Sequence, residues 1–187
     1  MAGELDGQSF EAYGMTMLKA LTLAAALLIV PTAASAQELF GGVYAHAVGT
    51  RLSLDSSRES GADLQIGYRG GKIIRGTGLQ PYVFGQANTK GDTSFAAAGL
   101  SWKFGDRIYV RPGIGIAIHN GSTKDFSVED RIAFGSRILF EPEIGVGARI
   151  NDRLSIEASW VHLSHGQLFG GQNPGIDTIG ARINLKL

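Results

Sequence analysis

The feature that most constrains the fold is a series of eight segments, each about ten residues long, in which apolar side chains alternate with small or polar ones. Period-two alternation is typical of strands, because successive side chains point to opposite faces. About ten residues is also the length that a tilted strand needs to cross a membrane. The predicted strands cover residues 38–48, 62–70, 79–88, 94–104, 108–118, 137–150, 154–164 and 176–187.

One face of these segments is nearly continuously apolar, whereas the other collects glycines and charges of both signs. A soluble barrel carries its charges outside, and 18% charged residues are few for that arrangement. We therefore predict that the apolar face contacts lipid and that the charges pair inside a narrow barrel, because unpaired buried charge is costly. The inward-facing charges expected to pair are Asp63, Arg69, Arg111, Glu141, Glu143, Arg149, Glu157 and Arg182.

The connections between the segments alternate in length. Tight turns are expected at Gly105-Asp106 and Asn151-Asp152, whereas 49–61 and 119–136 are long and polar. Short periplasmic turns and long extracellular loops are typical of outer-membrane barrels. The pattern predicts an all-β fold, an eight-stranded antiparallel transmembrane β-barrel with periplasmic termini. The connection at 70–78 is longer than this rule expects. A pore is disfavoured, because side chains fill the interior of an eight-stranded barrel.

Residues 1–36 form an N-terminal extension and secretory signal peptide in this interpretation. Lys19 precedes an apolar run at 20–30 that is too short to span a bilayer, and small residues follow up to an expected cleavage after Ala36. The barrel domain is then 37–187. With no cysteine in the chain, this exported domain relies on hydrogen bonds and packing rather than on disulfides.

The candidate site lies where the penultimate strand meets the last one. His162 and Ser164 extend the apolar face of segment 154–164, and Asp177 begins the apolar face of segment 176–187. Antiparallel neighbours joined by this connection would bring Asp177 beside His162 on the outer wall, near the outer rim. A hydroxyl, an imidazole and a carboxylate are the groups that nucleophilic hydrolysis uses.

A non-catalytic interpretation of these residues stays open. His162 and Ser164 are then a polar pair at an aromatic girdle beside Trp160, and Asp177 caps a turn. An unpartnered acid on a lipid-facing position is costly, however, which favours the catalytic interpretation. His46 and His119, near predicted loop ends, are interpreted as interfacial.

The residues also resemble the lipid A 3-O-deacylases of the PagL type. The resemblance rests on His162-Leu163-Ser164 and on the run 173–177, Asn-Pro-Gly-Ile-Asp. It implies an eight-stranded outer-membrane barrel of a Gram-negative bacterium. It further implies an esterase acting on lipopolysaccharide, with Ser164 as nucleophile, His162 as general base and Asp177 completing the triad.

The sequence departs from the family pattern beside the serine, where His165 stands in place of a frequent asparagine implied to help stabilise the oxyanion. The His165 imidazole and backbone amides around Gly166 are therefore candidate oxyanion donors. No cofactor and no metal are expected. A homodimer, a phospholipase or general lipase, and a non-catalytic structural or adhesion barrel remain alternatives.

Overall fold

The computed structural model describes residues 37–124, 131–168 and 173–187. The strands within these residues form one antiparallel sheet. The predicted signal peptide and N-terminal extension lie outside the described residues, so that division of the chain stays a prediction. The strands are β1 (Glu38–Ala45), β2 (Ala62–Arg69), β3 (Leu79–Asn88), β4 (Phe95–Trp102), β5 (Phe104–Gly105), β6 (Ile108–His119), β7 (Ile138–Arg149), β8 (Leu154–Leu163) and β9 (Ile176–Lys186).

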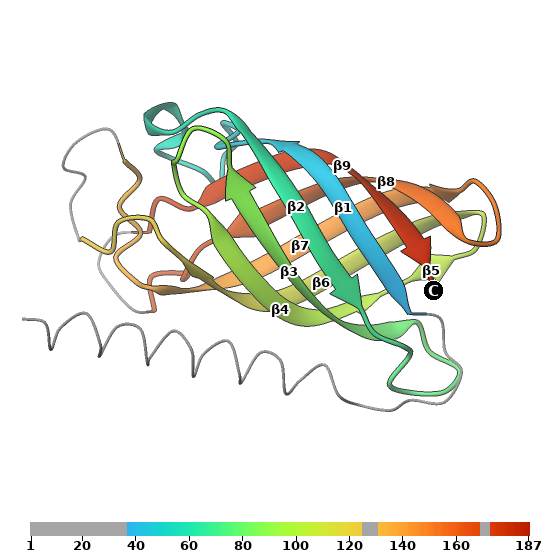
Figure 1. Cartoon of the computed structure of the whole chain (residues 1–187). Coiled ribbons are helices and arrows are strands. Elements are labelled where there is room, and N and C mark those ends of the chain that lie inside the picture. The colour runs from blue at the N-terminus through green and yellow to red at the C-terminus, as the bar shows by residue number, and fades with distance from the viewer. Residues whose placement is uncertain (1–36, 125–130, 169–172) are drawn as a thin grey trace, which may run out of the picture. The chain divides into compact units, whose positions relative to one another are not determined.

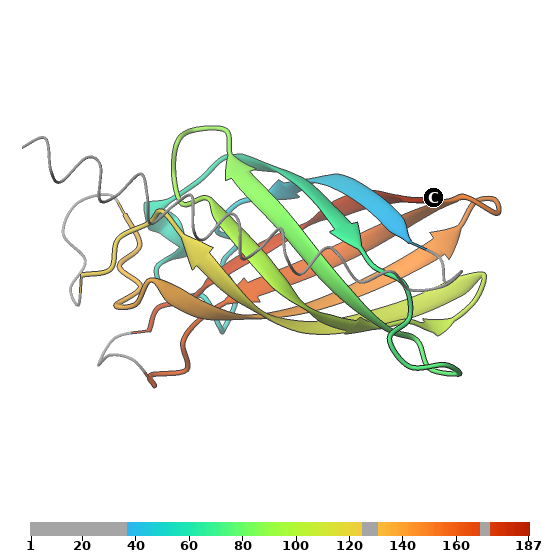
Figure 2. The same ribbon diagram turned by 60° about the horizontal axis from the view of Figure 1, so that its bottom comes forward.

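The sheet closes into a barrel. Its first and last strands meet, because β1 pairs with β9, while β4 pairs with β6 on the other side. The short β5 follows β4 after a single residue, Lys103, and also pairs with β6. Strands β4 and β5 are therefore two parts of one predicted strand. Counted together as one, they give the eight-stranded barrel that the sequence predicts (Figures 1 and 2). The one helix among the described residues is the 3-10 turn Ser56–Arg58, and no described helix is long and apolar enough to cross a membrane.

The two ends of the barrel differ in their connections. One end, called here the turn end, carries the connections 70–78, 106–107 and 150–153 and the C-terminus (Figure 1). The opposite, loop end carries 46–61, 89–94, 120–137 and 164–175. The predicted alternation of tight turns and long loops is confirmed, with 70–78 as the longest connection at the turn end.

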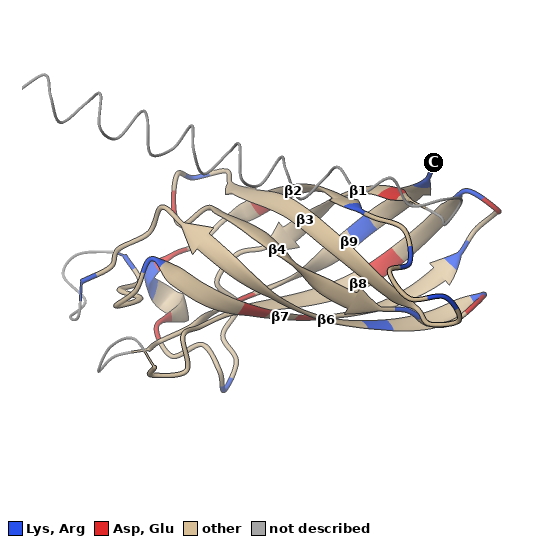
Figure 3. Ribbon diagram, turned by 90° about the horizontal axis from the view of Figure 1, so that it is seen from below, with Lys and Arg blue, Asp and Glu red and all other residues tan. Residues whose placement is uncertain are grey.

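The predicted faces are also confirmed. The outward apolar residues are exposed, among them Ile66, Ile108 and Val146 at 74%, 74% and 53%. Inside, Arg182 donates to Glu157 and Glu143, each at 2.8 Å, and Arg111 donates to Glu38 at 2.9 Å. The charges on the strands themselves are visible in Figure 3. An inward ion-pair network of this kind offsets the cost of burying charge.

The prediction that charged side chains face the interior is wrong for one residue, Arg149. Arg149 is the last residue of β7, its side chain is 41% exposed, and it pairs with Asp106 at 2.8 Å. The alternation would place it inward, but the barrel interior ends at this level, so the side chain reaches solvent at the turn end. The other seven charges predicted to face inward are buried.

Candidate active site

The site is built on a cross-strand pair at the loop end of β8 and β9. His162 lies directly opposite Asp177 in the register of the two strands. Its Nδ1 lies 2.7 Å from Asp177 Oδ1, and the two residues are only 7% and 0% exposed. Because an ionised carboxylate only accepts hydrogen bonds, Nδ1 is the donor in this contact, and Nε2 is left without a bond to Asp177.

Trp160 is a second partner of the same carboxylate. Its indole Nε1 donates to Asp177 Oδ1 at 2.9 Å, and its ring stacks against His162 at a centroid distance of 5.8 Å and an angle of 19°. Trp160 lies two residues before His162, so period two already puts both on one face. The indole therefore contacts both members of the pair. The non-catalytic interpretation gave Trp160 only the role of an interfacial anchor.

Ser164 follows the end of β8 and is partly exposed. It bridges to Phe140 of β7 through two backbone hydrogen bonds of 3.1 and 2.7 Å, which extend the strand geometry to this residue. Its side chain therefore shares the outward face with His162. Within the described residues no hydrogen bond joins Ser164 Oγ to His162, and such contacts often tighten only around substrate. The nucleophile assignment stays a prediction.

Loop 46–61 covers the pair from outside. The Val48 N–H donates to the Asp177 carbonyl at 2.8 Å, and the Leu54 N–H donates to the Pro174 carbonyl at 2.9 Å. The Thr50 hydroxyl donates to Asp177 Oδ2. The pair lies on the outward face at the loop end, as predicted, but this loop and Trp160 leave His162 and Asp177 only 7% and 0% exposed.

Gly175 explains part of the 173–177 run. Its φ of +66° lies in the left-handed region, which favours glycine. A Cβ there would lie 2.9 Å from His162 Cε1 and 2.6 Å from the Leu52 carbonyl oxygen. Only a residue without a side chain allows the last loop to pass between His162 and loop 46–61.

The two oxyanion candidates lie in a tight turn after Ser164. His165 is fully buried, and its backbone N–H donates to Asn173 Oδ1 at 2.9 Å. The Leu168 N–H returns to the His165 carbonyl at 3.0 Å, and Gly166 and Gln167 between them have φ of +59° and +60°. Residues 169–172 of this connection lie outside the described part of the chain. The oxyanion roles stay predictions.

The interpretation of His46 and His119 as interfacial is wrong, because each is only 5% exposed. His46 Nδ1 lies 2.9 Å from the Asp63 carboxylate, and Nε2 lies 3.0 Å from Glu59 Oε2. Burial alone would lower the pKa of His46, but the hydrogen bonds and charges of the two acids raise it from 6.5 to about 9. His119 bonds the Ser136 carbonyl at 2.7 Å and packs on Phe134. Alternation could not reveal these partners.

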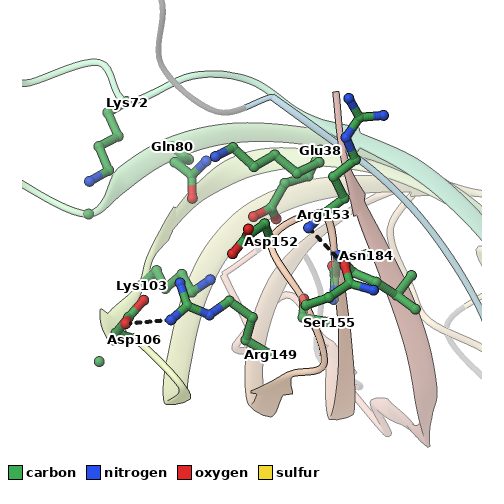
Figure 4. Close-up of a pocket in the computed structure, with 15 residues that line it drawn as sticks. Glu38, Lys72, Gln80, Lys103, Asp106, Arg149, Asp152, Arg153, Ser155 and Asn184 are labelled. Atoms are coloured by element: carbon green, nitrogen blue, oxygen red, sulfur yellow. Dashed lines mark hydrogen bonds and ion pairs between the residues drawn. The ribbon is translucent and has the colours of Figure 1, made fainter.

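A cavity of about 250 Å³ opens at the turn end (Figure 4). It contains none of the predicted site residues, since β8 begins there at Leu154 and ends near His162 at the opposite end. Charged side chains dominate its wall, namely Glu38, Lys72, Lys103, Asp106, Arg149, Asp152, Arg153 and Lys186. Among the described residues, no group of three His, Cys, Asp or Glu side chains could hold a metal ion.

Comparison with known proteins identifies the family. A profile described as lipid A 3-O-deacylase (PagL) matches residues 57–186, which is more than half of the chain. No curated protein matches the sequence. The crystal structure of the outer membrane enzyme PagL aligns with a TM-score of 0.54 and 20% identity, over 82% of this chain and 100% of that one. A de novo designed transmembrane β-barrel aligns with a TM-score of 0.50 and 12% identity, over 84% of this chain and 100% of that one.

The two kinds of match carry different weight. At 20% and 12% identity the structural alignments show the fold alone. The family rests on the profile match, which includes β8, the last loop and β9 up to Lys186. The homodimer that the sequence left open finds no support in these comparisons. The chain belongs to the lipid A 3-O-deacylase (PagL) family and is an outer-membrane β-barrel hydrolase.

Proposed function

We propose that the chain hydrolyses the ester that links a 3-hydroxyacyl chain to the 3 position of lipid A, by a Ser-His-Asp mechanism. The family match supports the substrate. The observation that carries the mechanism is the 2.7 Å contact between His162 Nδ1 and Asp177 Oδ1, which leaves Nε2 for Ser164 on the same face.

The catalytic steps assigned to the three residues are as follows. Ser164 Oγ attacks the acyl carbonyl while His162 Nε2 accepts its proton. His162 then returns the proton to the leaving sugar oxygen, and the acyl group stays on the serine. Water, deprotonated by the same imidazole, releases the hydroxy acid and restores Ser164. Asp177 keeps the ring oriented and stabilises the imidazolium in both halves.

The surface around Ser164 suits a lipid substrate. Phe140, paired with Ser164 across the strands, is 36% exposed, Ile138 is 50% exposed and Leu168 is 70% exposed. An acyl chain lying along the barrel wall can contact these side chains without leaving the bilayer. With the loop end facing outward, lipid A reaches the site by diffusion in the outer leaflet.

Gly166 is the better of the two candidate oxyanion donors. The His165 imidazole is fully buried and the His165 backbone N–H already donates to Asn173 Oδ1, whereas no described residue accepts from the Gly166 N–H. Backbone amides next to a nucleophile are a common source of such donors. We assign the oxyanion contact to Gly166 and a packing role to the buried His165 side chain.

Mass spectrometry of lipid A from a Gram-negative host expressing the chain tests this function. The intact chain should remove one 3-hydroxyacyl mass, and Ser164→Ala should leave lipid A unchanged. Ser159→Ala is a matched control, because Ser159 lies on the same strand but faces the barrel interior. This control should deacylate like the intact chain.

The same experiment separates the alternatives. Intact lipid A together with serine-dependent release of fatty acids from phospholipids would replace the proposed function with that of a phospholipase. Unchanged lipid A and phospholipid in all three strains, with the barrel folded in the outer membrane, would support a non-catalytic barrel.

A further inference from the structure

The Asp177 carboxylate has a third partner that no triad model requires. Its Oδ1 accepts from His162 and Trp160, and its Oδ2 accepts from the hydroxyl of Thr50, which lies 127 residues earlier in the chain. We propose that Thr50 is a positioning residue for the deacylation, holding Asp177 so that Oδ1 faces His162. This inference rests on the proposed function and adds a residue from loop 46–61 to it.

The Thr50 hydroxyl is itself fixed in direction. Its oxygen accepts the Leu52 N–H at 2.9 Å, so its single proton is left for Asp177. The flanking backbone is held to the last loop by the hydrogen bonds of Val48 to Asp177 and of Leu54 to Pro174, at 2.8 and 2.9 Å. The loop therefore presents the donor from a framework that includes Asp177 itself.

Thr50 matters because Asp177 is fully buried. A carboxylate oxygen without a donor in such a place is unfavourable, since water cannot replace the missing hydrogen bond. The terminal torsion of an aspartate is broad, so a carboxylate held at one oxygen only can rotate away from His162. Misorientation of the base slows the chemical step more than it weakens substrate binding.

Three substitutions measure this role with purified lipopolysaccharide as substrate. Thr50→Val replaces the hydroxyl with a methyl group of similar size and should lower kcat about 10- to 50-fold with KM little changed, because a small misplacement of a catalytic group costs up to about 100-fold in rate. Thr50→Ser keeps the donor and should stay within about threefold of the intact chain. If the Thr50→Val variant does not fold, Thr50→Ala removes the hydroxyl without adding bulk.

A second threonine provides a matched control. Thr93 also donates its hydroxyl to a buried carboxylate, Glu59 Oε1 at 2.9 Å, but this acid bonds His46 and not His162. Thr93→Val should leave kcat within about twofold. Combining Thr50→Val with Asp177→Asn tests the route of action, because a residue that works through Asp177 should add no further loss in that background.

A readout independent of turnover completes the test. In nuclear magnetic resonance spectra of the barrel in detergent, the His162 Nδ1 proton should give a low-field signal, which Thr50→Val should shift or broaden and Thr93→Val should not. An unchanged signal and kcat in Thr50→Val, additive loss with Asp177→Asn, or equal loss in Thr50→Ser would overturn the inference. An intact chain that keeps the Thr50-dependent signal but releases no acyl chain would count against the proposed function only.

Discussion

Two histidines at the loop end of the barrel both bond carboxylates, yet they differ in what they leave free. His46 has an acid on each ring nitrogen, Asp63 at 2.9 Å and Glu59 at 3.0 Å, and its side chain is completely buried. His162 has an acid on Nδ1 alone, and no described residue bonds its Nε2. A histidine with both nitrogens occupied is held as a cation, whereas one with a single free nitrogen can accept a proton from a neighbour.

The carboxylates that these two histidines bond also differ in their hydrogen-bond partners. Glu59 accepts hydrogen bonds from His46, from the Thr93 N–H and hydroxyl, and from the Ile132 N–H. It therefore joins three connections at the loop end, 46–61, 89–94 and 120–137. Asp177 instead accepts side-chain hydrogen bonds from Trp160 and from one imidazole, that of His162, which lies two residues before Ser164 on the same strand face. The comparison assigns His46 to stabilising the loop end, and the proposed function assigns His162 to the chemistry.

The largest expected effect comes from exchanging the two histidines for glutamine one at a time. His162→Gln removes the proposed general base and should lower kcat by about 10⁴-fold or more, as removal of a triad member does in other hydrolases. His46→Gln should stay within about threefold. Rates of hydroxy-acid release from lipopolysaccharide measure both, and equal losses in the two variants would remove the distinction.

The second effect is on stability, and here His46→Gln should have the larger effect of the two variants. His46→Gln leaves Glu59 and Asp63 facing each other without a cation, and breaking a buried ion pair in this way costs about 3 kcal/mol or more. His162→Gln should change the free energy of unfolding by much less. Urea unfolding in detergent, followed by tryptophan fluorescence, compares the variants, and a stable His46→Gln barrel would contradict the assignment.

The pH dependence of stability should follow His46. Its pKa is raised in the folded barrel from 6.5 to about 9, so its contribution is fully present below pH 6.5 and is lost as the pH rises through 9. The difference of about 2.5 pH units corresponds to a loss on the order of 3 kcal/mol between these limits. Unfolding midpoints should fall over this range in the intact chain, and the His46→Gln variant should lack that part of the slope.

The smallest effect is expected at the opposite end of the barrel. Lys103 lines the turn-end cavity (Figure 4). Its Nζ lies 4.0 Å from the centre of the Tyr109 ring. Lys103→Met should leave both kcat and KM within about twofold, because the cavity lies at the opposite end of the barrel from the proposed triad. A clear loss of deacylation, measured with the same substrate, would show that the two ends are coupled.

Local periodicity was enough to predict most of the barrel. Trp160, Val161 and His162 alternate in side as expected, and the cross-strand position of Asp177 follows from two neighbouring strands joined by one loop. The errors lie where a strand ends. Arg149 follows the alternation but sits past the end of the interior, and His46 lies just beyond β1, where the loops rather than the strands surround it.

The sequence by itself determined which side chains face lipid, which face the interior, and that a histidine, a serine and an aspartate share one face near the last loop. A period of two residues carries that information, because each strand side chain has only two directions. Only the tertiary structure decided that Thr50 and Trp160 hold Asp177 and that Glu59 reaches His46. The Thr50 and Glu59 contacts depend on how loop 46–61 folds back over the loop end of the barrel. Hydrogen bonds between residues far apart in the chain produce no periodic pattern in a single sequence.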